Sequence, residues 1–161
     1  MKGAIRRIAW GFVRGGVAAM AMTGMRQMTK GFGLVEQSPP DAIIKQRASG
    51  LLVRSPRLAF LVARRETALI ELAHWFYGAV GGVGFAMLPR LVLRSRWVGL
   101  GYGVLTTLMF ELGIVPILGL DKAKKIRPIE RLAFTADHLL YSLILAGGRE
   151  WVLPEKGRPR R

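Results

Sequence analysis

Several acids, histidines and arginines stand inside long apolar stretches of this sequence, where charge is costly to bury. The set that could do chemistry is Arg26, Glu71, His74, Glu111, Asp137 and His138. Carboxylates and imidazoles exchange protons when burial or a neighbouring charge brings their titration toward neutral pH. Such a group could relay protons or hold a small polar solute. The same residues could instead form a structural network of ion pairs that fixes how helices pack.

Two tyrosines accompany the histidines at a fixed spacing. Tyr77 follows His74 by three positions, and Tyr141 follows His138 in the same way. Residues three apart lie on one face of a helix. We therefore expect both tyrosines to line the same polar pocket as the histidines.

Metal and enzyme chemistry have little support in the sequence. Glu71-x-x-His74 has the spacing found in carboxylate-bridged di-metal bundles, but the chain has no second copy of that motif. His74 and His138 could in principle clamp a haem, and the absence of cysteine excludes thiolate ligands and disulfides. Hydroxyls inside the apolar stretches usually bond to their own helix backbone; they are Thr23, Thr106, Thr107 and Ser142. We expect no catalytic residues, no metal ligands and no cofactor, with haem or metal binding as the last alternative.

The elements that carry these residues are predicted by length and hydropathy. A bilayer core needs about 20 mostly apolar residues per helix. Four stretches meet this requirement at about 8–28, 67–88, 97–120 and 129–148. No run alternates with a period of two, so no strand is predicted. The expected fold is an all-α transmembrane bundle over residues 1–148, followed by a basic disordered tail over 149–161.

The first connection contains an additional helical signal. Ser55-Pro56 is a typical helix start, with a capping residue before proline. Residues 57–65 then mix apolar and basic side chains. This pattern predicts either an amphipathic helix lying at the membrane interface or a simple extension of the second span.

The depth of the ionisable groups can be estimated from the helical rise. If successive helices alternate in direction, the first and third connections lie on one side. At 1.5 Å per residue, His74 is roughly 10 Å from that side, and Glu111, Asp137 and His138 are roughly 12–14 Å from it. Pro116 predicts a kink one turn beyond Glu111. Three helices therefore place ionisable groups at one level, which predicts an enclosed polar pocket.

Glycines recur at a spacing that favours close helix packing. The pairs are Gly11 and Gly15, Gly78 and Gly82, and Gly99 and Gly103. Small residues four apart let two helix backbones approach each other in a membrane. The contacts could be made within the bundle, in a homo-oligomer, or with a larger membrane protein complex for which this chain is an accessory subunit.

The charge distribution indicates a lipid rather than a nucleic-acid partner. The formal net charge is +15, and most Lys and Arg residues stand between the apolar stretches. There they would meet anionic lipid headgroups. The Lys and Arg counts on the two sides of the expected bundle are equal, so they do not orient it. We place both termini in the cytoplasm.

Short motifs in order along the chain resemble a known family. They are Pro39-Pro40-Asp41-Ala42-Ile43, Ala73-His74-Trp75-Phe76-Tyr77-Gly78, Gly99-x-Gly101-Tyr102-Gly103, Pro116-Ile117-Leu118-Gly119-Leu120 and Asp137-His138-Leu139-Leu140-Tyr141. Between about Gly11 and Gly148 the chain resembles the YagU-like group of small bacterial inner-membrane proteins, although Ser142 stands where the second His-x-x-Tyr-Gly motif would have glycine. The resemblance implies a multi-pass inner-membrane protein. It implies no established activity, no cofactor and no catalytic residue.

Overall fold

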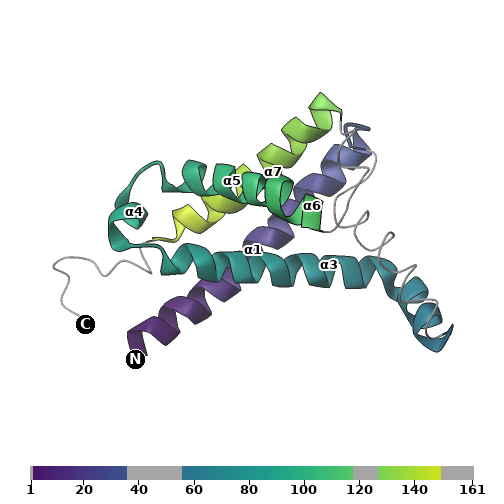
Figure 1. Ribbon diagram of the computed structural model, residues 1–161, viewed down its shortest axis with the longest axis horizontal. Coiled ribbons are helices and arrows are strands. Elements are labelled where there is room, and N and C mark those ends of the chain that lie inside the picture. The colour runs from purple at the N-terminus through teal and green to yellow at the C-terminus, as the bar shows by residue number, and fades with distance from the viewer. Residues whose placement is uncertain (1, 36–55, 118–126, 150–161) are drawn as a thin grey trace.

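The computed structural model describes residues 2–35, 56–117 and 127–149, and all regular structure within these ranges is helical (Figure 1). The expected all-α class is therefore confirmed. The long helices are α1 (Lys2–Gly31), α3 (Pro56–Met87) and α7 (Pro128–Gly147). A fourth helical stretch joins α5 (Val98–Met109), the π-helical turn η1 (Phe110–Ile114) and α6 (Val115–Ile117). Each of the four expected spans overlaps one of these stretches. Leu88, Trp97 and Gly148 lie just outside the helix bounds, and 118–120 fall outside the described residues.

The helix expected in the first connection joins the expected second span across a kink. α3 begins at Pro56, as the Ser55-Pro56 signal predicts, and its backbone leaves helical geometry at Arg65 with φ −123° and ψ 17°. The helix therefore bends where the basic stretch ends. Of the expected tail, only Arg149 lies within the described residues.

Composition separates the four helical stretches more sharply than length does. Within the described residues, one helical stretch, Val98–Ile117, is both long and apolar enough to cross a bilayer. It contains the widened turn η1, which carries Glu111 and ends two residues before Pro116. Proline lacks the amide hydrogen that an α-helix would use at that point, and a π-turn is one way to absorb the resulting strain.

The helices meet around a small apolar core. α1 packs against α3 and α7, and α5 packs against α7. In Figure 1, α1 crosses α3 obliquely. The core consists of Ala18, Met22, Phe85, Ala86, Leu93, Val98, Tyr141, Leu145 and Ala146. This arrangement leaves the polar side chains of α1, α3 and α7 near the C-terminal part of α1.

Candidate functional site

The glycine crossing of α1 and α3 sets the register of the site. Gly11 lies against Gly82, and Gly15 lies against Gly78 and Gly82. A Cβ built at Gly15 would be 2.8 Å from the Gly82 Cα, closer than atoms can approach, so the two backbones touch at this point. Because this pairing is antiparallel, residues later in α1 meet residues earlier in α3. The crossing therefore brings the end of α1 beside the segment that contains Glu71.

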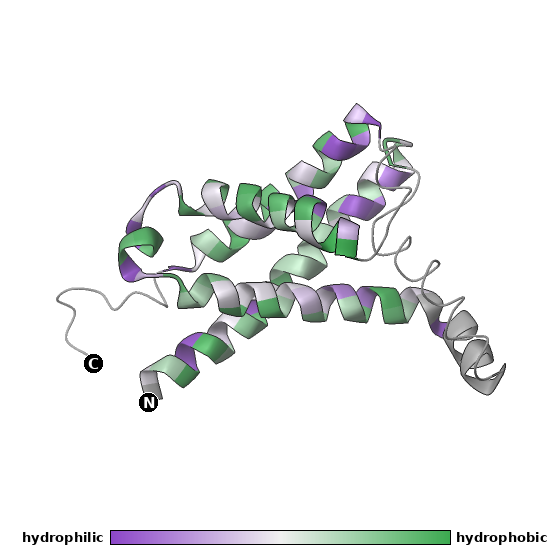
Figure 2. Cartoon of the chain, viewed as in Figure 1, coloured by the Kyte–Doolittle hydropathy of each residue, from purple (hydrophilic) through white to green (hydrophobic). Residues whose placement is uncertain are grey.

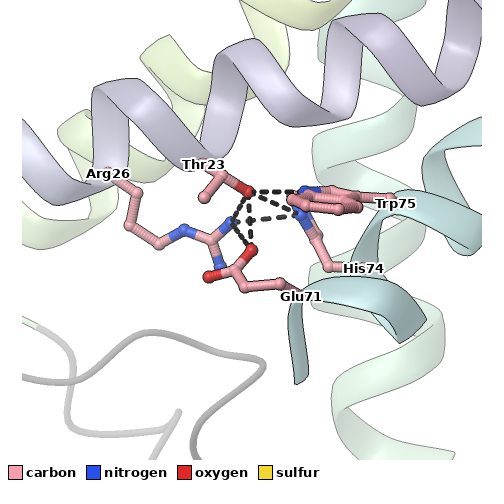
Figure 3. Close-up of polar contacts among 5 residues, drawn as sticks. All are labelled: Thr23, Arg26, Glu71, His74 and Trp75. Atoms are coloured by element: carbon pink, nitrogen blue, oxygen red, sulfur yellow. Dashed lines mark hydrogen bonds and ion pairs between the residues drawn. The ribbon is translucent and has the colours of Figure 1, made fainter. Parts of the chain in front are cut away.

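Thr23 is the centre of the resulting polar cluster (Figure 3). Its hydroxyl donates to Glu71 Oε2 at 2.7 Å. The same oxygen accepts from Arg26 Nη2 at 3.3 Å and from Trp75 Nε1 at 3.1 Å. One donor and two acceptor positions are all that a hydroxyl has. The Thr23 hydroxyl is thus fully used. It also lies 3.4 Å from His74 Nδ1, so it contacts four side chains from two helices.

Arg26 supplies the positive charge of the cluster. It is 5% exposed, and its Nη2 lies 3.1 Å from His74 Nδ1 and 3.9 Å from Glu71 Oε2. Its Nε is buried and has no hydrogen-bond partner. The guanidinium therefore joins the acid and the histidine, while its buried Nε–H has no partner.

Hydrogen-bond partners assign opposite tautomers to the two histidines. A guanidinium can only donate, so His74 Nδ1 accepts from Arg26, and the ring is neutral with its proton on Nε2. A carbonyl can only accept, so His138 Nδ1, which lies 3.0 Å from the Phe134 oxygen, carries a proton. When neutral, His138 therefore has a lone pair on Nε2, whereas His74 has an N–H there.

α7 brings Asp137 and His138 to the same neighbourhood. Arg26 interacts electrostatically with both residues, and His138 interacts in the same way with His74. Asp137 is 7% exposed, and its Oδ1 has no hydrogen-bond partner. The ring of Phe134 lies 4.5 Å from that of His138, centroid to centroid, and forms an apolar wall on one side. Asp137 and His138 on α7 are thus coupled electrostatically to the cluster on α1 and α3.

Glu111 and the two tyrosines do not join the hydrogen bonds of this cluster. Glu111 pairs with Arg131 at 3.4 Å, and it reaches the cluster only through an electrostatic interaction with His138. Tyr77 is 52% exposed. Tyr141 is buried and donates to the carbonyl of Gly78 at 2.5 Å, at the glycine crossing. We expected both tyrosines beside the histidines. Tyr141 lies at the glycine crossing instead, because Gly78 has no side chain and leaves space for the tyrosine ring.

Thr23 and Trp75 belong to the cluster although sequence reasoning did not select them. The other three hydroxyls bond to their own helix, as expected: Thr106 to Tyr102 and Gly103, Thr107 to Gly103, and Ser142 to Leu139. Thr23 precedes Arg26 by three positions and so shares its helix face. That spacing was the available signal for Thr23. Trp75 had no comparable signal.

The remaining glycine pair packs α5 against α7. A Cβ at Gly99 would be 3.0 Å from the Ala146 Cβ, and one at Gly103 would be 2.5 Å from the Ser142 hydroxyl. All six glycines at the expected spacing therefore make their close contacts inside this chain.

The described residues hold no group of three or more His, Cys, Asp or Glu side chains placed to bind a metal ion. Comparison with protein-family models, with curated proteins and with solved structures gave no match. The resemblance to the YagU-like group therefore stays an expectation from sequence, and function must be inferred from the site itself.

Proposed function

We propose that this chain is a multi-pass protein of the bacterial inner membrane, with four spans and a buried polar cluster that exchanges protons or binds a small polar solute. The spans would be α1, the part of α3 that follows the kink at Arg65, the stretch from α5 to α6, and α7. The cluster of Thr23, Arg26, Glu71, His74 and Trp75, with Asp137 and His138, would be the working site. We assign it no catalytic role.

Exposed apolar side chains support the membrane placement. Large hydrophobic residues are exposed on all four helical stretches, including Val13, Val17, Phe76, Val80, Val104, Leu112, Leu132 and Leu143. Figure 2 shows hydrophobic residues along α5 and hydrophilic ones gathered toward the neighbouring ends of α1 and α7. Exposing apolar surface on every long helix is unfavourable in water, whereas contact of the same surface with lipid is not.

The observation that carries the functional proposal is a pair of unsatisfied buried atoms. Asp137 Oδ1 is an acceptor and Arg26 Nε is a donor, both are buried, and neither has a partner. Leaving a buried polar group unpaired costs about 1–3 kcal/mol. A water molecule or a small polar solute beside either atom would supply its missing partner.

The histidine tautomers supply the proton chemistry. His138 has an Nε2 lone pair that can take up a proton, and His74 has an Nε2–H that can donate a hydrogen bond to a water molecule or solute. Histidine is the side chain whose charge changes near neutral pH. A proton that arrives at His138 would lie within the electrostatic reach of Glu111 and Arg26, which act on it in opposite senses.

The alternative of an accessory subunit loses its main support. It relied on glycine faces that would contact a partner, and those six glycines are occupied by contacts within the chain. Association with itself or with a larger complex stays a prediction without a surface assigned to it.

Membrane placement can be tested by labelling single cysteines, because the native chain has none. Ser95→Cys and Phe32→Cys lie near opposite ends of the bundle, and Val104→Cys lies on the exposed apolar surface of α5. In intact cells we expect a membrane-impermeant maleimide to label only one of the two end positions and to leave Val104→Cys unlabelled. Labelling of Val104→Cys as fast as an end position would reject the four-span arrangement.

The role of the cluster can be tested by proton flux into proteoliposomes that contain a pH-sensitive dye. We expect Asp137→Asn and His138→Gln to reduce proton uptake relative to the native protein. Glu130→Gln is the matched control, because Glu130 pairs with Arg127 at the start of α7 and lies outside the cluster. Equal proton uptake by all four proteins would reject the proton-exchange role. The solute-binding role is tested separately by tryptophan fluorescence, and it would be rejected if Asp137→Asn left every solute-induced change in that fluorescence intact.

A further inference from the structure

A cavity of about 310 Å³ lies at the end of the bundle opposite the polar cluster. It opens between the start of α5 and the end of α7. Its lining residues are Arg96, Gly99, Leu143, Ala146, Gly147 and Arg149. Two arginines from distant parts of the sequence therefore line the cavity together with small and aliphatic residues.

The charge of this cavity favours an anion. Arg96 and Arg149 both line it, and no acidic residue within the described part of the chain does. Arg96 stacks on Trp97, with its guanidinium carbon 5.1 Å from the ring centroid, which holds the charge at the rim. Planar guanidinium groups bind phosphate oxygens through paired hydrogen bonds. The nearby Arg14 is already used, because its Nε donates to the Ile144 carbonyl at 2.8 Å.

The apolar part of the cavity continues onto the outer surface. Leu143 lines the cavity and is 49% exposed. Leu100 and Val104 on α5 are also exposed, at 39% and 48%. A ligand whose phosphate lies between the arginines could therefore lay a hydrocarbon chain along this surface. Inorganic phosphate or a soluble phosphate ester would use only the arginines.

We propose that the cavity between α5 and α7 binds the headgroup of an anionic glycerophospholipid, with Arg96 and Arg149 on the phosphate and Leu143 beside an acyl chain. This inference rests on the membrane placement proposed above. Zwitterionic lipids have the same phosphate but add an ammonium group. Two arginines without a lining acid would repel that group, so the site should prefer anionic lipids.

The test is the melting temperature of the purified protein in a neutral detergent with added lipid. At a phosphatidylglycerol concentration of about 100 times Kd, we expect Tm to rise by roughly 5 °C or more. Phosphatidylcholine should give a smaller shift, and glycerol phosphate at the same concentration should give almost none. In Arg96→Gln/Arg149→Gln the shift with phosphatidylglycerol should be lost.

Arg90→Gln/Arg94→Gln is the matched control, because it removes the same charge from exposed positions on α4 (Arg90–Arg94), outside the cavity lining. It should keep the lipid shift. Equal loss in both double variants would show diffuse attraction and overturn the site, and a full shift with glycerol phosphate would show a soluble-phosphate site instead. If the double variant does not fold, Arg149→Gln alone should lose most of the shift, and a shift left intact would again overturn the site. Labelling of Val104→Cys from water would refute the membrane placement separately. If Val104→Cys is protected but Arg96→Gln/Arg149→Gln keeps the full Tm shift with phosphatidylglycerol, only the lipid site is refuted.

Discussion

α1 and α3 contact each other in two regions that work in opposite ways. At Gly11, Gly15, Gly78 and Gly82 the backbones touch and no side chain fits between them. About three turns further along α1, the same helices are joined by long polar side chains, with Arg26 reaching Glu71 and His74. Because the helices cross obliquely, they separate on moving away from the glycines (Figure 1).

The polar cluster depends on the close glycine crossing for a geometric reason. Arg26 and Glu71 need space between the helices, and only the divergence after a close crossing provides it. In a membrane, packing and interhelical hydrogen bonds must both stabilise association, because lipid is as apolar as the helix surface. We therefore expect the crossing to respond to added volume and the cluster to respond to lost hydrogen bonds.

The largest effect is expected at the crossing. Gly82→Ala would place a Cβ 2.6 Å from the Gly15 Cα, so the helices must move apart. Overpacking of this kind costs about 1–3 kcal/mol or more. Thermal or denaturant unfolding in detergent would measure it. Gly101→Ala is the control, since nothing lies within 4 Å of its new Cβ and alanine favours helix. Equal stability of the two variants would contradict the backbone contact.

The next effect is expected at the centre of the cluster. Thr23→Val keeps the shape of the side chain but leaves Trp75 Nε1 and Glu71 without their hydroxyl partner. Losing such a partner in a buried site costs about 1–3 kcal/mol. Thr106→Val removes a hydroxyl that bonds only to its own helix, and it should cost much less in the same unfolding measurement. If Thr106→Val were as damaging as Thr23→Val, the interhelical role of Thr23 would be wrong.

A smaller effect is expected where the two regions adjoin. Tyr141→Phe removes the hydrogen bond to the Gly78 carbonyl and leaves the ring in place. A net loss of about 1 kcal/mol is typical of one such bond. Tyr77→Phe, on a half-exposed tyrosine, should change stability very little. A loss at Tyr77 equal to that at Tyr141 would show that Tyr77 takes part in the packing.

Helix positions were predictable because they depend on properties that run along the chain. Apolar length located the helices, and the rise per residue placed His74, Glu111, Asp137 and His138 near one level. The glycine spacing indicated close contacts but could not identify partners, because any two small-residue stripes can pair. The pairing of Gly15 with Gly78 emerges only when the antiparallel crossing is known.

Rotation about each helix axis was the property that sequence could not supply. Tyr141 follows His138 by three residues, yet its hydroxyl bonds at the glycine crossing and not among the cluster's polar groups. Thr23 was expected to bond to its own backbone, but Glu71 from another helix competes for its proton. Both outcomes depend on which neighbour fills the space opposite, and that neighbour is distant in sequence.

The finest distinction is between the two histidines, and it can be measured without any loss of stability. With only two histidines in the chain, nitrogen NMR of labelled imidazoles can be assigned from His74→Gln and His138→Gln. We expect His74 to be protonated on Nε2 and His138 on Nδ1. Arg26→Met should release the His74 tautomer, because the guanidinium fixes it, and should leave His138 unchanged, because the Phe134 carbonyl remains. A native His74 that carried its proton on Nδ1 would mean that Arg26 does not donate to it. The proposed site would then lose the hydrogen-bond donor that it places on His74 Nε2, while His138 would keep its Nε2 lone pair.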